Sequence, residues 1–313
     1  MGNKEFYMTT DDGKNLYCSC WLPEEGHWKG IVQILHGMAE HIGRYGEFAL
    51  ELNKAGYAVY GHDQRGHGQS ISPSQPAGFF AETAGFSRVA EDAKQLSFQI
   101  RKSRPELPLY LFGHSMGSFV ARRCVQLYGD QLSGAIFSGT GSDPGLLGSA
   151  GRALAIWETK RKGALHPSSL LDALSFGGFN RPFRPNRTPF DWLSRDQDQV
   201  DRYIEDPLCG HISTAGFFAD LFSGMKLIHR PEEIRKVPAS LPLLFISGDH
   251  DPVGKNGKSV MKSARQYREA GAKDVTVKLY PGARHELLNE LNRDEVFRYV
   301  IEWMDDTMQY QPD

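Results

Sequence analysis

The sequence has almost no net charge, few cysteines and no long apolar run, and each shortage excludes a class of protein. The formal net charge is -2, which leaves no electrostatic footprint for binding nucleic acid. No apolar run approaches the length that spans a bilayer. The four cysteines, Cys18, Cys20, Cys124 and Cys209, are too few and too scattered for a disulfide framework and show no zinc-site spacing. The sequence therefore predicts buried free thiols, no metal, no nucleic-acid partner and no integral membrane segment.

The start of the chain and its length narrow the class further. The first six residues lack the basic start and apolar middle of a secretory signal. We therefore expect a cytoplasmic protein. With 313 residues, the chain can form one large α/β domain or a domain that carries an insertion.

One short motif organises the rest of the sequence. An apolar run over residues 109–112 ends at Gly113, Ser115 follows, and Gly117 precedes a helical pattern. This is the G-x-S-x-G motif between a strand and a helix, the context in which it forms a nucleophile elbow. A serine in so sharp a turn needs small neighbours, and the following helix directs its N-terminal dipole at negative charge that forms there. Ser115 is therefore the candidate nucleophile.

Strand-like and helix-like runs alternate on both sides of this motif. A hairpin is expected over residues 6–22, because Asp12-Gly13 separates two short strand-like runs. Buried strands are expected at 30–35, 57–60, 109–113, 132–138, 241–248 and 275–280, and helices at 45–52, 86–100, 260–269 and 296–304. This rhythm predicts βαβ units and a mainly parallel sheet, with the chemistry at the carboxyl ends of the strands.

The rhythm breaks between residues 141 and 240, where no comparable strand occurs. Helical fragments and aromatic residues fill this stretch instead. We interpret residues 141–240 as an inserted helical cap, and residues 1–140 and 241–313 as the core. A cap above the serine also forms a wall of its pocket.

The base and the acid that a serine nucleophile needs follow at the ends of later strands. In this arrangement the chain order is serine, acid, histidine, and Asp251 and His285 each come just after a strand. Asp249 is a second candidate acid, although a turn-stabilising role suits it better. His250 is a second candidate base, but its partner would have to come from the wrong side. The candidate catalytic residues are Ser115, Asp251 and His285.

The tetrahedral intermediate of acyl transfer needs two backbone N–H donors. The first expected donor is the amide of Met116, directly after the nucleophile. The second is the amide of Met38, in the loop after the first strong parallel strand, where Gly37 allows close approach of the backbone. Met38 and Met116 are therefore the candidate oxyanion hole.

Several motifs together resemble the monoacylglycerol lipase and lysophospholipase branch of the α/β-hydrolases. They are His-Gly-Met-Ala-Glu-His at 36–41 with Arg44-Tyr45, His-Asp-Gln-Arg-Gly-His-Gly-Gln-Ser at 62–70, Gly-His-Ser-Met-Gly at 113–117, Gly-Asp-His-Asp at 248–251 and Gly-Ala-Arg-His-Glu at 282–286. The resemblance implies an eight-stranded, mostly parallel sheet flanked by helices, a helical cap and no cofactor. It also implies Ser115, Asp251 and His285 as the triad and the amides of Met38 and Met116 as the oxyanion hole.

The leading hypothesis is a serine hydrolase that cleaves carboxylic esters of fatty acyl chains, of monoacylglycerol or lysophospholipid type, through an acyl-enzyme. One alternative is a carboxylesterase or aminopeptidase for short acyl or aminoacyl substrates, which would need acidic cap residues to hold the substrate amine. Another is a ligand-binding protein on a hydrolase fold, because fold does not determine function. The expected partner is a small acyl ester, and transient contact of the cap with a membrane surface stays open. The sequence does not define an oligomeric state.

Overall fold

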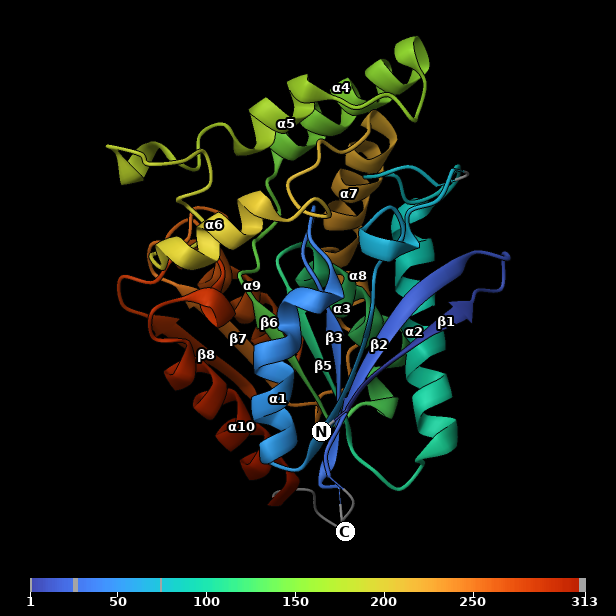
Figure 1. Ribbon diagram of the computed structural model, residues 1–313, viewed down its shortest axis with the longest axis vertical. Coiled ribbons are helices and arrows are strands. Elements are labelled where there is room, and N and C mark those ends of the chain that lie inside the picture. The colour runs from blue at the N-terminus through green and yellow to red at the C-terminus, as the bar shows by residue number, and fades with distance from the viewer. Residues whose placement is uncertain (1, 25–27, 74, 310–313) are drawn as a thin grey trace.

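An eight-stranded sheet forms the centre of the molecule (Figure 1). The computed structural model describes residues 2–24, 28–73 and 75–309. The strand order is β1-β2-β4-β3-β5-β6-β7-β8. Strand β2 is antiparallel to both of its neighbours, β1 and β4, and the other neighbouring pairs are parallel. The strands are β1 (Gly2–Thr9), β2 (Asn15–Leu22), β3 (Gly30–Leu35), β4 (Tyr57–His62), β5 (Leu109–His114), β6 (Gly134–Ser138), β7 (Leu243–Gly248) and β8 (Val275–Tyr280). The predicted mostly parallel sheet of eight strands is confirmed.

Helices α1 and α10 cover one face of the sheet, and α2, α3 and α9 cover the other. The described helices are α1 (Gly46–Lys54), α2 (Gly85–Ser103), α3 (Met116–Tyr128), α4 (Leu146–Lys162), α5 (Ser169–Phe176), α6 (Gln197–Glu205), α7 (Ala215–Ile228), α8 (Pro231–Ile234), α9 (Lys258–Glu269) and α10 (Arg293–Gln309). Short 3-10 turns are η1 (Ile42–Tyr45), η2 (Gly68–Ser70), η3 (Gly129–Gln131), η4 (Arg181–Phe183) and η5 (Leu287–Asn289). In the part of the chain that the structure describes, no helix is both long and apolar enough to cross a bilayer.

Alternating side chains of the central strands divide between two cores. In β3, Ile31 and Leu35 join the core under α2, α3 and α9, whereas Val32 and Ile34 join the core under α1 and α10. Every residue of β3, β5, β6 and β7 is buried, as expected for parallel strands covered on both faces. The apolar runs in the sequence follow from this double burial.

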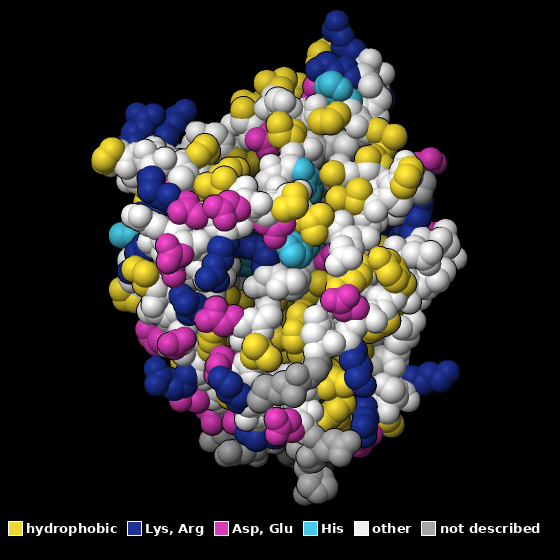
Figure 2. Space-filling view, viewed as in Figure 1, with side chains coloured by type: hydrophobic (Ala, Val, Ile, Leu, Met, Phe, Trp, Pro, Cys, Tyr) yellow, Lys and Arg dark blue, Asp and Glu magenta, His cyan; other side chains and the backbone are white. Residues whose placement is uncertain are grey.

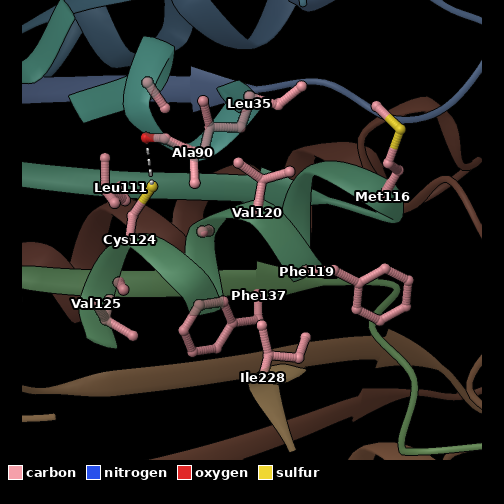
Figure 3. Close-up of a cluster of buried hydrophobic side chains, with 14 of the residues drawn as sticks. Leu35, Ala90, Leu111, Met116, Phe119, Val120, Cys124, Val125, Phe137 and Ile228 are labelled. Atoms are coloured by element: carbon pink, nitrogen blue, oxygen red, sulfur yellow. Dashed lines mark hydrogen bonds between the residues drawn. The ribbon is translucent and has the colours of Figure 1, made fainter. Parts of the chain in front are cut away.

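A cluster of buried hydrophobic side chains lies beneath the turn that carries Ser115 (Figure 3). Phe119 and Val120 of α3 are buried there, and the thiol of Cys124 points toward the carbonyl of Ala90 at 3.8 Å. All four cysteines are free, and Cys209 is the one that is only partly buried. The expectation of buried free thiols therefore holds for the other three.

The segment between β6 and β7 carries helices α4 to α8, of which α4, α5 and α6 lie above the carboxyl edge of the sheet (Figure 1). Helix α7 packs against α4 and also against the core helices α2 and α3. The amide and hydroxyl of Thr214 both donate to the carbonyl of Gly78, at 2.9 and 2.7 Å. This segment is therefore joined to the core through α7 and the loop before it.

Candidate functional site

Ser115 lies in a strained turn between β5 and α3. Its backbone has φ 50° and ψ -119°, a conformation that costs a non-glycine residue of the order of 1–3 kcal/mol. Its amide donates to the carbonyl of Ser138 at 2.9 Å, and its carbonyl accepts the hydroxyl and amide of Ser118. These bonds hold the elbow that the motif predicts.

The two glycines of the motif are required by close backbone approach. A Cβ on Gly117 would lie 2.0 Å from the carbonyl oxygen of Leu35, and one on Gly113 would lie 2.4 Å from the carbonyl oxygen of Gly117. The absence of these side chains lets the end of β3 pack directly on the first turn of α3. Ser115 and the loop after β3 are thereby brought side by side.

Asp251 and His285 meet at the ends of β7 and β8. The imidazole Nδ1 lies 3.0 Å from Asp251 Oδ1, and both side chains are almost fully buried. The Asp251 carboxylate also accepts the amide of Val253 at 2.8 Å and the hydroxyl of Ser247 at 3.2 Å. An ionised carboxylate only accepts hydrogen bonds, so in the neutral imidazole Nδ1 carries the proton and Nε2 has the free lone pair.

The charges of the Asp251 carboxylate and the protonated His285 imidazole stabilise each other. Burial raises the pKa of the Asp251 carboxyl, but the charge and hydrogen bond of His285, together with the Val253 amide and the His114 ring, bring this pKa below its ordinary value. Burial lowers the pKa of His285, but Asp251, together with nearby Glu286 and Glu40, raises it above the ordinary value. The pair therefore favours an ionised acid beside a histidine that binds a proton readily.

The two alternative candidates from the sequence lie elsewhere. Asp249 Oδ1 accepts the amide of Gly282 at 2.7 Å, which is the turn-stabilising role expected for it. The side chain of His250 is exposed. The structure therefore brings together Asp251 and His285, rather than Asp249 or His250.

The Ser115 hydroxyl makes no hydrogen bond to His285 among the described residues. The imidazole nevertheless lies beside the elbow, because the ring of His114, the residue before the serine, is 4.7 Å from that of His285. A Cβ on Gly139 would lie 3.0 Å from the His285 ring and 3.2 Å from the His114 ring. Catalytic hydrogen bonds of this kind often tighten only in the substrate complex.

The two candidate oxyanion donors belong to neighbouring elements. Met116 is the first residue of α3, and Met38 is a half-buried residue of the loop after β3 that packs against the core. The Gly37 amide donates to Glu40 Oε1, and the carbonyl of Ala39 accepts the amide of Gly210 at 2.9 Å. The loop that contains Met38 is therefore fixed on both sides.

A buried ionic network beside the site has no counterpart in the sequence predictions. Arg44 donates to Glu40 Oε2 and to both carboxylate oxygens of Glu286, at 2.7 Å each, and the hydroxyl of Tyr45 donates to Glu40 at 2.9 Å. Glu40 and Arg44 are four residues apart and Glu286 adjoins His285. The four-residue spacing of Glu40 and Arg44 is typical of a local ion pair, but no pattern in the sequence indicates the contact of Arg44 with Glu286.

His41, Asp206 and Cys209 place one nitrogen, one oxygen and one sulfur atom within 4.8 Å of one another. His41 Nδ1 accepts the amide of Gly43, and its Nε2 lies 2.8 Å from Asp206 Oδ2. Both ring nitrogens are thus used in hydrogen bonds. These bonds account for the cluster without a metal, and the absence of a metal stays a prediction.

Comparison with known proteins places these features in a family. The protein-family model described as "Serine aminopeptidase, S33" matches residues 26–292. The chain is 29% identical to monoglyceride lipase of Rattus norvegicus, over 91% of this chain and 84% of that protein. It is also 29% identical to monoacylglycerol lipase of Mycolicibacterium smegmatis, over 93% of each.

A solved structure has the same fold over nearly the whole length of the chain. The crystal structure of a highly thermostable carboxyl esterase from Bacillus coagulans, in complex with glycerol, superposes with a TM-score of 0.91 at 30% identity and covers 98% of this chain and 99% of that one. The predicted resemblance and the expectation of a serine ester hydrolase are thereby confirmed. Because the family model spans most of its length, the chain belongs to the serine aminopeptidase S33 family of α/β-hydrolases.

Proposed function

We propose that this protein hydrolyses monoacylglycerols, with Ser115 as nucleophile, His285 as general base and Asp251 as the acid that orients it. The observation that carries the proposal is the buried Asp251–His285 pair beside the strained Ser115 turn. The names of the relatives support the substrate class, since those from Rattus norvegicus and Mycolicibacterium smegmatis are named for it.

Acylation begins when Ser115 Oγ attacks the ester carbonyl carbon and its proton passes to His285 Nε2. The negative charge on the former carbonyl oxygen is stabilised by the amides of Met38 and Met116. The C–O ester bond then breaks, and His285 donates its proton to the departing glycerol oxygen. Asp251 keeps the imidazole in the tautomer that this transfer needs.

Deacylation repeats these steps with water. His285 Nε2 takes a proton from water as the water oxygen attacks the acyl carbon. The bond to Ser115 Oγ breaks, the proton passes to that oxygen, and a fatty acid leaves. Apart from the ester and water, the proposed steps use only the side chains and amides named here.

An aminopeptidase is the main alternative, and it needs a free carboxylate that can hold the substrate amine. Five of the acidic residues of the segment between β6 and β7 are already in ion pairs or hydrogen bonds: Glu158, Asp191, Asp196, Asp201 and Asp206. The same segment carries contacting aromatic rings, among them Phe176, Phe179 and Phe218. The aromatic rings favour an acyl chain over a charged amine, whereas Asp172, Asp198 and Glu205 are among the carboxylates that remain without such a bond in the described part of the chain and would have to hold the amine.

Labelling with a fluorophosphonate tests the nucleophile. We expect the wild-type protein to be labelled and the Ser115→Ala variant to be unlabelled. Ser142→Ala is a matched control, because Ser142 bonds Ser259 and has no part in the elbow. An unlabelled wild type would instead favour a ligand-binding protein.

A turnover panel tests the substrate class. It contains long-chain and medium-chain monoacylglycerols, lysophosphatidylcholine, short p-nitrophenyl esters and aminoacyl amides. We expect glycerol esters to exceed the amides by orders of magnitude in kcat/KM. If the amides are the better substrates, only the acyl-transfer chemistry of the proposal stands.

Residues 141–240 act, in this proposal, as a cap on the core formed by residues 1–140 and 241–313, and the cap touches membrane surfaces transiently. Figure 2 shows hydrophobic side chains over the upper part of the molecule, where α4 and α5 lie, with Lys and Arg side chains at the two ends of this region. Large exposed apolar residues there are Leu146, Leu147, Trp157, Leu165, Leu170 and Leu174. Exposed apolar residues beside basic ones suit an interface with anionic lipid.

Vesicles of phosphatidylcholine with one third phosphatidylserine test this contact. Leu146 and Leu147 are 89% and 81% exposed, so a double change to serine does not disturb the core. We expect the double variant to co-sediment less with vesicles and to hydrolyse soluble short esters at the wild-type rate. Equal sedimentation of both proteins would exclude this surface as the contact.

A further inference from the structure

The indole of Trp192 lies against the imidazole of His285. The ring centroids are 5.0 Å apart and the planes are inclined by 33°. Trp192 comes from the segment between α5 and α6, far from His285 in the sequence. The contact matters because the imidazole is almost completely buried and alternates between neutral and cationic forms during acyl transfer.

Hydrogen bonds attach the segment of Trp192 to the loop of His285. The amide of Glu286 donates to the carbonyl of Leu193 at 2.8 Å, and the Arg284 guanidinium donates to the carbonyl of Ser194 at 3.0 Å. These bonds come from the residues immediately before and after the histidine. The indole and the imidazole are therefore held on one structural unit.

On the side away from His285, residues of the segment between β6 and β7 hold the indole of Trp192 in place. The Trp192 amide donates to Asn180 Oδ1 at 2.8 Å, and its ring meets that of Phe179 edge-on, with centroids 5.1 Å apart. Phe179 in turn contacts Phe176 of α5. The indole thus has a defined orientation rather than a free choice of rotamers.

We propose that Trp192 is a positioning residue for His285, whose aromatic face shields the imidazole and stabilises its cationic form. The inference rests on the proposed function, which makes His285 the base. An aromatic face attracts a cation, most strongly when the face belongs to tryptophan. The imidazolium that forms in each half-reaction is therefore favoured by the contact with the indole, and the imidazole is kept facing the elbow.

Other groups around the imidazole also influence its charge. Asp251 is hydrogen-bonded to it, Glu286 and Glu40 act on it through space, and the neutral ring of His114 contacts it. The three carboxylates are held by hydrogen bonds to residues other than Trp192. Replacing the indole therefore leaves the effect of these carboxylates on the His285 pKa unchanged.

Two substitutions distinguish the effect of the aromatic face on the His285 imidazole from the effect of merely shielding that ring from water. Trp192→Leu keeps an apolar side chain over the imidazole but removes the π face, and Trp192→Phe keeps a smaller face. We measure kcat/KM against pH with a soluble p-nitrophenyl ester and titrate the His285 imidazole by NMR. In Trp192→Leu we expect the pKa of His285 to fall by about 0.4–1.5 pH units, with a smaller fall in Trp192→Phe. Trp28→Leu is the control, because its indole contacts Arg104 instead of a titrating ring.

A pKa of His285 that stays or rises in folded Trp192→Leu would overturn the inference. If that variant does not fold, the fluorescence difference between wild type and Trp192→Phe replaces it. Protonated imidazole quenches indole emission, so the fluorescence difference must change with pH as His285 titrates. A fluorescence difference that does not change with pH would also overturn the inference. Failure of the proposed function is recognised separately, as a wild type that fluorophosphonate does not label.

Discussion

Arg44 and Glu286 form a paired ionic contact that joins the loop after β3 to the loop that carries His285. Two nitrogens of the guanidinium bind the two carboxylate oxygens at 2.7 Å each, and both side chains are nearly buried. The same guanidinium binds Glu40, which anchors the Gly37 amide. One cation thus fixes the candidate oxyanion loop relative to the candidate base.

Arg44→Met is predicted to destabilise the protein by about 3–5 kcal/mol, because it leaves Glu40 and Glu286 buried without their cation. We also expect kcat on a soluble ester to fall, since the two loops lose their common anchor. Urea unfolding at pH 7 measures the first effect and steady-state kinetics the second. Arg44→Lys keeps the charge but loses the paired geometry, so its losses should be smaller. A free energy of unfolding within 1 kcal/mol of wild type in Arg44→Met would contradict the prediction.

The sequence predicts the sheet and the Asp251–His285 pair because both depend on local patterns. Strands buried on both faces are continuous apolar runs, and residues just after parallel strands meet at one edge. The contact of Arg44 with Glu286 and that of Trp192 with His285 join residues 242 and 93 positions apart. No periodicity encodes such contacts, since they arise only when separate loops pack against each other.

Asp251→Asn and Asp249→Asn form a matched pair that identifies the acid. Asn at 251 no longer holds His285 in the required tautomer, so kcat should fall by about 10⁴. Asn at 249 keeps the oxygen that accepts the Gly282 amide, and kcat should change by less than about threefold. Steady-state kinetics on one ester decides between them. The opposite ranking would make Asp249 the acid.

Activity should decrease as the pH falls through a pKa of His285 that lies above the ordinary imidazole value of about 6.5. The sign follows from Asp251 and Glu286, whose negative charges favour protonated His285, while the reaction needs the neutral ring. Glu286→Gln removes one of these charges and should move the acid limb of kcat/KM to lower pH. A limb that moves to higher pH in this variant would show that Glu286 acts in another way.

Gly117→Ala should abolish or severely reduce folding, because the added Cβ would lie 2.0 Å from the carbonyl oxygen of Leu35, a backbone atom that has no freedom to move aside. Gly46→Ala is the control at the start of α1. A Cβ there meets nothing within 4 Å, and alanine in a helix is favoured over glycine by roughly 0.5–1 kcal/mol. Thermal unfolding of both variants measures the contrast. Equal melting temperatures would disprove the steric account of the elbow.

Asp220 of α7 caps the first turn of α2 from outside that helix. Its carboxylate accepts the Gly85 amide at 3.1 Å, at a helix start where Ala84 offers no side-chain acceptor. Burial raises the pKa of the Asp220 carboxyl to about 6, while the Gly85 bond lowers it. The folded protein therefore binds this proton more tightly than the unfolded chain, and stability attributable to Asp220 is lost as pH rises from about 4 to about 6.

Asp220→Asn should remove this pH dependence, because the amide oxygen still accepts from Gly85 but carries no charge. At pH 7 we expect Asp220→Asn to be more stable than wild type by about 1–3 kcal/mol, and at pH 4 the two should be nearly equal. Asp220→Ala removes the acceptor as well and leaves the Gly85 amide without a partner, which costs about 1–2 kcal/mol relative to the asparagine variant. Urea unfolding of the three proteins at pH 4, 5, 6 and 7 tests both parts. A gap between wild type and Asp220→Asn that does not widen with pH would mean that the carboxylate is already stabilised by the helix dipole of α2, and the contact would then be an ordinary N-cap.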